Sequence, residues 1–404
     1  MPEEWGVFSL GKILTKRQLG GNYRNSERET QWPLIKMGNL GRGKISLDKI
    51  EYVDTSQPPA TCDRLEVDDV LFNTRNTVEL VGKVAMWRGE LPEAYFNSNI
   101  MRMEFDESRV SSKRFMNFML NTSKSIGALR AIAIGTTSVA AIYSRDLVNL
   151  LVAVPPKPEQ EAIAEALSDA DALIESLQQL IAKKRQIKQG TMQALLTGKQ
   201  RLPGLHKPWK EGLLGALGDF LKGRGVSRDQ AASGDLACVR YGEIYTKHND
   251  YIKVFNSWIS REVASAATRL VHGDLLFAGS GETKEEIGKC VAFVGSEEAY
   301  GGGDIVILRS SGNDPKFLGY YLNTAVIRAR KASKGQGDAV VHISAEALGS
   351  IEIEIPELEE QTAIATILTD MDTELAELET RLAKTRALKQ GMMQALLTGR
   401  IRLV

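Results

Sequence analysis

Gln160–Lys199, QEAIAEALSDADALIESLQQLIAKKRQIKQGTMQALLTGK, recurs near the end of the chain as Gln361–Arg400, QTAIATILTDMDTELAELETRLAKTRALKQGMMQALLTGR. About half of the aligned positions are identical, with no gap, at an offset of 201 residues. That offset is half of the 404-residue chain. The sequence therefore predicts a duplication of one unit, which consists of a globular domain followed by a long helix.

An apolar stripe runs along each repeated segment. From Ile163 onward, apolar residues alternate at spacings of four and three, as in the seam of a coiled coil, and the second copy is apolar at the same positions. Each helix would be roughly 60 Å long, and burying each Leu or Ile contributes about 1.5–3 kcal/mol. We therefore expect the helices to pair; packing of each stripe on its own domain is the alternative. The predicted interface residues are Ile163, Leu167, Ile174, Leu177, Ile181, Ile364, Leu368, Leu375, Leu378 and Leu382.

Prolines and glycines set the expected limits of these helices. Pro155, Pro156 and Pro356 favour helix starts, and Gly198 and Gly399 favour helix ends. The fold class that follows is α/β globular domains plus long α-helices, with two domains joined by an antiparallel two-helix coiled coil of pseudo-two-fold symmetry. The expected boundaries are 1–154 for the first domain, 155–203 for the first helix, 204–355 for the second domain and 356–404 for the second helix.

Composition narrows the class of protein. The chain has 51 basic and 51 acidic residues, which argues against a wholly basic nucleic-acid binder, although residues 10–44 are locally positive. No apolar run is long enough for a membrane span and no signal peptide is recognised, so we expect a cytoplasmic protein without membrane contact. Cys62, Cys238 and Cys290 are predicted to be reduced core residues, and no metal site is expected.

The two globular halves share a framework but differ between its parts. Asp69–Phe72 matches Asp274–Phe277, whereas Asn73–Leu80 bears little likeness to Ala278–Glu286. Loops that diverge on a common skeleton are expected if the two domains read different targets, although neutral drift would look similar. Each half is predicted to be α/β with a mixed sheet. The expected strands are 69–72, 81–87, 100–105, 289–294, 305–308 and 351–355, and the expected helices are 112–130 and 314–332.

Motifs for catalysis are absent from the sequence. The stretch around Gly288-Lys289 lacks the first glycine and the final Ser or Thr of a P-loop, and no G-x-G-x-x-G opens a helix after a strand. Pro155-Pro156 lacks the flanking residues with which amino-methyltransferases hold adenine. The carboxylates at 169, 171, 370 and 372 are predicted to be solvated positions on the helices. We therefore expect no catalytic residue and assign catalysis to a partner.

The chain resembles the specificity subunit of a type I restriction-modification system. The likeness rests on the helix start Pro155–Ile163 with its echo Pro356–Ile364, on Gln-Ala-Leu-Leu-Thr-Gly at Gln193 and Gln394, and on Trp-x-x-x-x-Leu-Gly at Trp5. It covers the whole chain. The second helix start lacks two of the prolines of the first, which leaves open only how sharply that helix begins.

This resemblance implies a non-catalytic subunit of a restriction endonuclease and adenine-methyltransferase complex. Its two target-recognition domains would each read half of a split site in double-stranded DNA, and the coiled coil would set the spacer. The implied partners are two methyltransferase subunits and the translocating restriction subunits. No cofactor is expected on this chain, because S-adenosylmethionine, ATP and Mg are expected on those partners.

Local charge and loop divergence select candidate DNA-binding residues, with Arg favoured because its fork matches guanine or phosphate. Two other classes of function stay open from the residues alone. One is a coiled-coil scaffold that joins proteins without touching DNA, and the other is a self-sufficient methyltransferase or nuclease. The candidate DNA-binding residues are Lys16, Arg17, Arg24 and Arg75 in the first domain, and Lys222, Arg224, Arg228 and Lys284 in the second.

Overall fold

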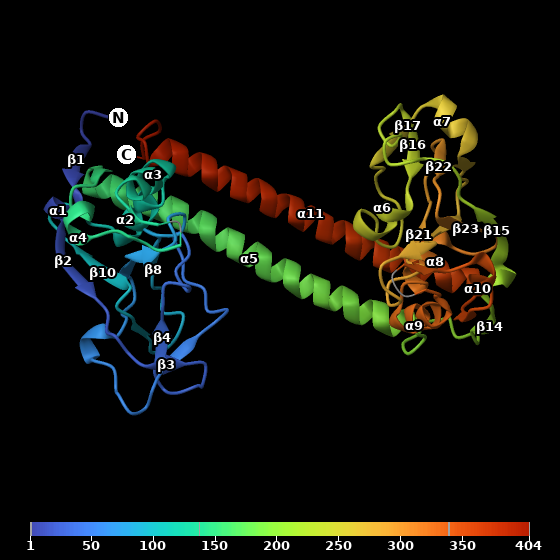
Figure 1. The fold of residues 1–404 in the computed structure, drawn as a ribbon, viewed down its shortest axis with the longest axis horizontal. Coiled ribbons are helices and arrows are strands. Elements are labelled where there is room, and N and C mark those ends of the chain that lie inside the picture. Colours follow the sequence, from blue (N-terminus) through green and yellow to red (C-terminus); the bar gives the residue numbers. More distant parts are fainter. Residues whose placement is uncertain (1, 137, 338–339, 404) are drawn as a thin grey trace. The chain divides into compact units, whose positions relative to one another are not determined.

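The computed structural model describes residues 2–136, 138–337 and 340–403 (Figure 1). The chain divides into two compact units. Unit 1 comprises Met1–Gln178 with Thr380–Val404, and unit 2 comprises Gln179–Glu379. Each unit therefore contains one globular domain, the beginning of the long helix that follows this domain, and the end of the other long helix.

The domain of unit 1 is built on a four-stranded antiparallel sheet in the order β2-β10-β6-β8. A second sheet, β3-β5-β4-β9, contains one parallel pair, β4 with β9, and β1 pairs with β13 beside the helix start. The apolar runs of β6 and β10 are buried in the core. The bounds are β1 (Gly6–Ser9), β2 (Leu14–Leu19), β3 (Asn25–Ser26), β4 (Pro33–Ile35), β5 (Glu51–Val53), β6 (Val70–Asn73), β7 (Arg75–Asn76), β8 (Val84–Met86), β9 (Tyr95–Phe96), β10 (Ile100–Phe105), α2 (Lys113–Leu120), α3 (Ser123–Ala131), β11 (Ile134–Gly135), β12 (Ala140–Ala141) and β13 (Leu151–Val154).

The domain of unit 2 repeats this plan. Its four-stranded antiparallel sheet has the order β15-β23-β19-β21, and its second sheet, β17-β16-β22-β18, again contains one parallel pair, β16 with β22. The strand that precedes the long helix, β25, pairs with β14. The bounds are β14 (Lys210–Leu213), β15 (Gly218–Lys222), β16 (Leu236–Val239), α6 (Tyr241–Thr246), β17 (Ser257–Ile259), α7 (Arg261–Ala266), β18 (Thr268–Arg269), β19 (Asp274–Ala278), β20 (Ser280–Gly281), β21 (Cys290–Ala292), β22 (Ala299–Gly301), β23 (Ile305–Ser310), α8 (Pro315–Tyr321), α9 (Ala325–Lys334), β24 (Val341–His342) and β25 (Glu352–Ile355).

The helices predicted for 112–130 and 314–332 are each two helices. The first is interrupted at Asn121-Thr122, between α2 and α3. Asn121 uses its side-chain amide to donate to the carbonyl of Val84 at 2.9 Å, and Thr122 caps α3 by accepting from the backbone N–H of Ser125. Asn323 makes the equivalent bond to Cys290. Side-chain bonds to the backbone therefore end one helix and position the next.

The long helices α5 (Lys157–Leu195) and α11 (Leu358–Leu396) each carry a buried glutamine as their fourth residue. Gln160 donates to the carbonyls of Pro155 (2.9 Å) and Arg109 (2.8 Å), and its own carbonyl accepts from the N–H of Ser111 (3.0 Å). Gln361 donates to the carbonyl of Pro356 in the same way. The repeated proline-glutamine pattern thus fastens the first turn of each helix to its domain, because a buried amide is stable only when its hydrogen bonds are made.

Both ends of each long helix enter a domain core. In unit 1, Ile163 and Leu167 of α5 share a hydrophobic cluster with Leu396 and Leu397 at the end of α11. The start of α5 therefore lies beside the end of α11. Unit 2 repeats this arrangement, with the start of α11 and the end of α5 in one cluster formed by Ile364, Leu368, Leu195 and Leu196 together with residues of the domain.

The helices run antiparallel within each unit, side by side (Figure 1). In unit 2, Arg185 and Lys188 of α5 pair with Glu379 and Asp372 of α11, so rising numbers on one helix meet falling numbers on the other. The predicted fold of α/β domains on an antiparallel helix pair is confirmed. The packing combines both alternatives, because the first turns of each stripe lie in a domain core, whereas the middle residues Leu177 and Ile181 are buried outside those cores.

Two details of the sequence analysis are wrong. Asp171 and Asp372 are not solvated, because antiparallel packing places each of them against a lysine of the opposite helix. Asp169 and Asp370 are exposed, as predicted. Cys62 is exposed and not part of the core. It lies on a short 3₁₀ turn, where its backbone carbonyl accepts a hydrogen bond from Arg102. Cys238 and Cys290 are buried thiols.

Candidate nucleic-acid interface

The predicted DNA-binding residues of unit 1 lie on separate elements. Lys16 and Arg17 are neighbours on the exposed part of β2, where Lys16 pairs with Glu104 at 3.3 Å. Arg17 donates from Nη1 to the Ser144 hydroxyl at 3.0 Å. Arg24 lies in the loop after β2 and Arg75 on β7, and both are exposed. Lys16 and Arg17 are consecutive on a strand and have different partners, and the structure does not gather the four cations into one cluster.

In unit 2 the predicted residues lie on two loops. Lys222 ends β15, and Arg224 and Arg228 follow it in the loop that leads to β16. All three are exposed. Lys284 lies in a different loop, between β20 and β21. Of the four, Arg228 lines a surface cavity, which it shares with a residue that the sequence analysis did not select, Arg240.

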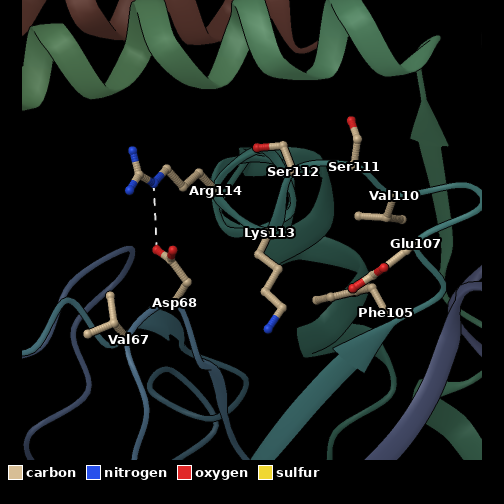
Figure 2. A pocket seen from close by; sticks show the side chains of 9 residues that line it. All are labelled: Val67, Asp68, Phe105, Glu107, Val110, Ser111, Ser112, Lys113 and Arg114. Carbon is tan, nitrogen blue, oxygen red and sulfur yellow. Dashed lines mark ion pairs between the residues drawn. The ribbon is translucent and has the colours of Figure 1, made fainter.

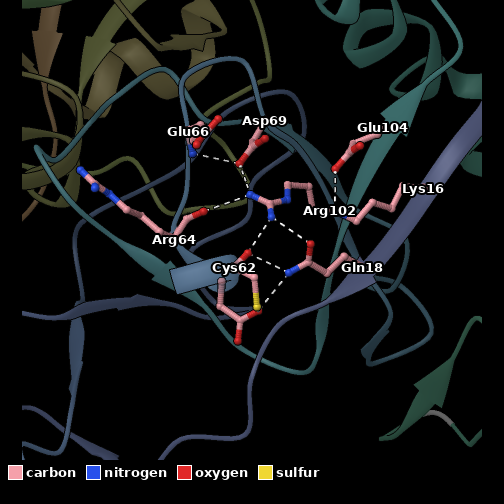
Figure 3. Close-up of polar contacts among 9 residues, drawn as sticks. Lys16, Gln18, Cys62, Arg64, Glu66, Asp69, Arg102 and Glu104 are labelled. Carbon is pink, nitrogen blue, oxygen red and sulfur yellow. Dashed lines mark hydrogen bonds and ion pairs between the residues drawn. The ribbon is translucent and has the colours of Figure 1, made fainter. Parts of the chain in front are cut away.

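A buried arginine clamps the sheet that carries Lys16 and Arg17. Figure 3 shows Arg102 of β10 at the centre of this network. Its Nη1 donates to Asp69 at 2.9 Å and to the carbonyl of Arg64 at 3.0 Å, and its Nη2 donates to the Gln18 side chain at 2.9 Å and to the carbonyl of Cys62 at 2.7 Å. A charged group buried here is stable because nearly all of its donors are used.

A related arginine–aspartate pair occurs in unit 2, where Arg309, whose side chain is 41% exposed, forms two hydrogen bonds of 2.9 Å to Asp274. Neither arginine was selected from the sequence. The available signal was the shared Asp at the start of the matching strands β6 and β19, since a buried strand that opens on a carboxylate requires a cation nearby. The Arg102 clamp holds β2 to its sheet through Gln18, and the Arg309 pair joins β23 to β19. Both are structural supports for the domains.

A cavity of about 600 Å³ lies in unit 1 below α5 (Figure 2). Arg114 reaches Asp68 across one side of it at 3.6 Å, and Lys113 and Glu107 line the rest with Ser111 and apolar residues. The opposite charges balance, so the cavity shows no preference for an anionic ligand. Among the residues that the structure describes, no group of three or more His, Cys, Asp or Glu side chains is arranged to hold a metal ion.

Ion pairs between the helices repeat at the offset of 201. Lys389 pairs with Asp171 at 2.5 Å in unit 1, and Lys188 pairs with Asp372 at 2.6 Å in unit 2. Further pairs tie the segment after each helix to the start of the other, because Arg402 binds Glu159 and Arg201 binds Glu360. The predicted seam residues Ile174, Leu375, Leu378 and Leu382 are half-buried along the same helices.

Comparisons with known proteins agree with this architecture. The family model of the type I restriction modification DNA specificity domain matches twice, over residues 2–185 and 207–385. Both copies of the repeat are thus matched, and the chain belongs to this family. No helix of the described residues is both long enough and apolar enough to cross a membrane.

Two proteins of Methanocaldococcus jannaschii are similar over the full chain. One, named as the MjaX specificity subunit of a type I restriction enzyme, is 26% identical over 420 residues, which cover 100% of this chain and 95% of that protein. The MjaVIII specificity subunit is 22% identical over 426 residues, which cover 100% and 94%. The match to specificity subunits does not favour a scaffold without DNA binding.

Solved structures share the fold. The S subunit of a type I restriction-modification system from M. genitalium superimposes with a TM-score of 0.60 at 15% identity, over 97% of this chain and 96% of the other. A chain from a structural study of complex assembly and conformational transition in the type I system gives a TM-score of 0.52 at 18% identity, over 98% of both chains. The architecture is therefore retained while most residues differ.

Proposed function

We propose that each domain of this specificity protein reads one half of a split site in double-stranded DNA, and that the helix pair sets the spacing between the halves. The observation that carries the proposal is the duplication itself. The two units repeat the same sheets, the same glutamine hydrogen bonds at the helix starts and the same ion pairs between the helices. The loops that connect the strands differ in sequence. A common frame with two different surfaces suits an asymmetric bipartite target.

We further propose that catalysis belongs to partner subunits. Two methyltransferase subunits would dock on the helix pair, and restriction subunits with translocase activity would join them. S-adenosylmethionine, ATP and Mg would bind to those partners, and the complex would work on DNA in the cytoplasm. Support comes from the family membership and from the exposed polar faces of α5 and α11, which leave surface for protein contacts.

Selection of duplexes from a random pool tests the proposal. The full chain is combined with its methyltransferase partner, bound duplexes are sequenced, and affinity is measured across a range of salt concentrations. We expect two short conserved sequences at a fixed spacing, with affinity that falls as salt rises because phosphate contacts release counterions. One extra base pair between the halves should abolish tight binding, since it rotates one half by roughly 35° relative to the other. Enrichment of no sequence would refute the proposal.

A further inference from the structure

A second cavity of about 600 Å³ opens on the domain of unit 2. Its lining includes Gly225, Arg228, Arg240, Tyr241, Gly303 and Asp304. Tyr241 is 41% exposed, so its ring is accessible at the mouth of this cavity. The walls come from the loop after β15, the start of α6 and the turn before β23, so that three segments distant in sequence meet here.

Arg240 is held in this cavity by a carboxylate behind it. Its backbone N–H donates to Glu243 Oε2 at 3.1 Å, and its Nε lies 3.6 Å from Glu243 Oε1. Glu243 is buried and also accepts a hydrogen bond from the Ser257 hydroxyl. Among the described residues, the Nη groups of Arg240 have no hydrogen-bond partner. Nε is buried and faces Glu243 as an ion pair, not as a hydrogen bond, and the outer donors of the guanidinium remain available to a ligand.

Unit 1 shows that the turn itself does not require such an arginine. Lys36 occupies the equivalent position, and its backbone N–H donates to the side chain of Asn39 at 2.9 Å, as Arg240 does to Glu243. The Lys36 ammonium, however, is bound within the domain, by Glu51 at 2.8 Å and Asn25 at 3.0 Å. In unit 1 this corner therefore holds an ammonium bound by two side chains, and in unit 2 it holds a guanidinium that faces Glu243 at Nε and, among the described residues, has no partner at its Nη groups.

The backbone around the cavity is strained. Val226 has φ +60° and Asp304 has φ +57°. A β-branched residue rarely adopts positive φ, and such conformations persist only where the surrounding structure fixes them, often at ligand sites. Val226 also belongs to the loop 223–232, one of the segments in which the two domains diverge. A loop that differs between the two domains thus forms one wall.

We propose that this cavity reads a guanine in the half-site bound by unit 2, with Arg240 donating to O6 and N7 in the major groove and with Arg228 and Tyr241 beside it. This assignment rests on the proposed function. A guanidinium fork matches those two acceptors. The two arginines are accompanied by Glu243 and Asp304, so the local charge is close to balanced, which favours a neutral base edge over a phosphate. Fixed side-chain geometry is also what base reading requires and phosphate contact does not.

Duplex selection with variants of the full chain, in complex with its methyltransferase partner, tests the assignment. For Arg240→Ala we expect an unchanged half-site for unit 1, and a roughly ten- to hundredfold loss of preference for guanine at one position of the other half-site. Arg240→Lys should give an intermediate loss, because the charge remains without the fork. The matched control is Arg328→Ala, which removes an exposed arginine of α9 outside the cavity and should leave both half-sites unchanged.

Salt dependence separates base reading from phosphate binding. Loss of a base contact lowers affinity for the selected site and leaves the slope of log affinity against log salt unchanged, whereas loss of a phosphate contact lowers that slope by about one. An Arg240→Ala variant with a lower slope and an unchanged selected sequence would overturn the assignment and show a phosphate site. A variant with unchanged sequence and slope would overturn it as well.

The outcomes distinguish this inference from the proposed function. If the wild-type chain selects no sequence, both fail. If the wild type selects a bipartite site that Arg240→Ala retains in full, the function stands and the guanine assignment alone fails. Should Arg240→Ala misfold, Arg228→Ala on the exposed loop provides the decision: a changed preference within the same half-site supports the assignment, and an unchanged preference rejects it.

Discussion

Two ion pairs join the long helices, Lys389–Asp171 in unit 1 and Lys188–Asp372 in unit 2. They are equivalent by sequence, but their surroundings differ in chemistry. In unit 1 the Lys389 ammonium lies over the Phe118 ring, and Arg88 approaches Asp171 to 4.0 Å. In unit 2 Tyr320 replaces the phenylalanine, and its hydroxyl donates to Asp372 at 2.6 Å.

Burial works against ionisation of Asp372, but the hydrogen bonds from Lys188 and Tyr320 outweigh it and hold the pKa of this carboxyl below its usual range. Burial and the hydrogen bond to Asp372 raise the pKa of Tyr320. The duplication thus preserves the ion pair and varies its surroundings. The stability of unit 2 should therefore depend more strongly on its ion pair than the stability of unit 1 depends on the equivalent pair.

Removal of the carboxylate should produce the largest effect. Asp372→Ala leaves the Lys188 ammonium and the Tyr320 hydroxyl without their acceptor, and we expect it to cost about 3–5 kcal/mol of unit 2 stability. Asp171→Ala should cost about 1–2 kcal/mol less, because it deprives only the cations Lys389 and Arg88 of their acceptor and no tyrosine hydroxyl. Hydrogen exchange of helix residues 179–195 and 157–178, measured in one experiment, reports the two units separately. Equal losses would contradict the proposed difference.

A buried lysine provides the second contrast. Lys331 of α9 packs over Gly288, where Leu129 of α3 packs over Gly82 in unit 1. Its ammonium donates to the Gly288 carbonyl at 2.5 Å, and burial lowers the pKa of Lys331 to about 8. The unfolded chain binds this proton up to about pH 10.4. Below about pH 8 the ammonium is charged in both states, and unit 2 bears the full free-energy cost of burying this charge. As the pH rises from 8 to 10.4, the unfolded state keeps the proton that the folded state has lost, and unit 2 should gain up to about 3 kcal/mol of stability.

Lys331→Leu, which copies unit 1, checks this. The variant should be more stable than the wild type near pH 7 by about 1–3 kcal/mol, and the difference should disappear toward pH 10.4. Chemical denaturation at several pH values measures it, and subtraction of the two curves removes the titration of other groups. A variant that keeps the wild-type pH dependence would show that Lys331 is not its source.

The sequence predicted the elements whose signal is periodic or local. The 4-3 stripe identified both long helices, and the strand 100–105 matches β10. The roles of Gln160 and Gln361 were not recognised, although the residues themselves were used as a motif, because their partners lie about 50 positions away in the domain.

The misplaced carboxylates have a related cause. Asp171 and Asp372 looked solvated because a single helix presents them to water, and only the antiparallel register brings Lys389 and Lys188 to them. Similarly, the charge-based selection of DNA-binding residues omitted Arg240, because only the fold shows that Glu243 faces its Nε side, whereas Glu51 binds the ammonium of the equivalent Lys36. Tertiary pairing, and not residue type, decides which cations remain available.

Exchange of the aromatic residues at the ion pairs should give a smaller effect. Tyr320→Phe removes one hydrogen bond to Asp372 and keeps the contact with Lys188, so we expect a loss of about 1–2 kcal/mol in unit 2. The reciprocal Phe118→Tyr places a hydroxyl near Asp171 and should be neutral or slightly stabilising in unit 1. Hydrogen exchange of each unit measures both. A large loss in Phe118→Tyr would mean that unit 1 has no room for the hydroxyl and that the sites differ in shape as well as in chemistry.

The smallest expected difference concerns the two tryptophans that open the domains. Trp5 donates from Nε1 to Glu159 at 3.0 Å, whereas Nε1 of Trp209 is buried without a hydrogen-bond partner among the described residues. Arg201 binds both oxygens of Glu360, at 2.7 and 2.6 Å, in place of the single arginine contact and the indole contact that Glu159 receives in unit 1.

Replacement of each tryptophan by phenylalanine tests whether this difference has an energetic cost. Both variants lose part of a packed ring, but Trp5→Phe also breaks a hydrogen bond to a charged group, and Trp209→Phe removes an unsatisfied donor. We therefore expect Trp5→Phe to be more destabilising to its unit by about 0.5–1.5 kcal/mol, the net contribution of one hydrogen bond. Arg201→Lys, made with Trp or with Phe at position 209, provides a control: because an ammonium lacks the bidentate fork, a larger loss from Trp209→Phe in this background would show that the arginine keeps the indole from Glu360. If both phenylalanine variants lose equal stability, ring packing alone determines the role of these residues, and the domains are equivalent at this point.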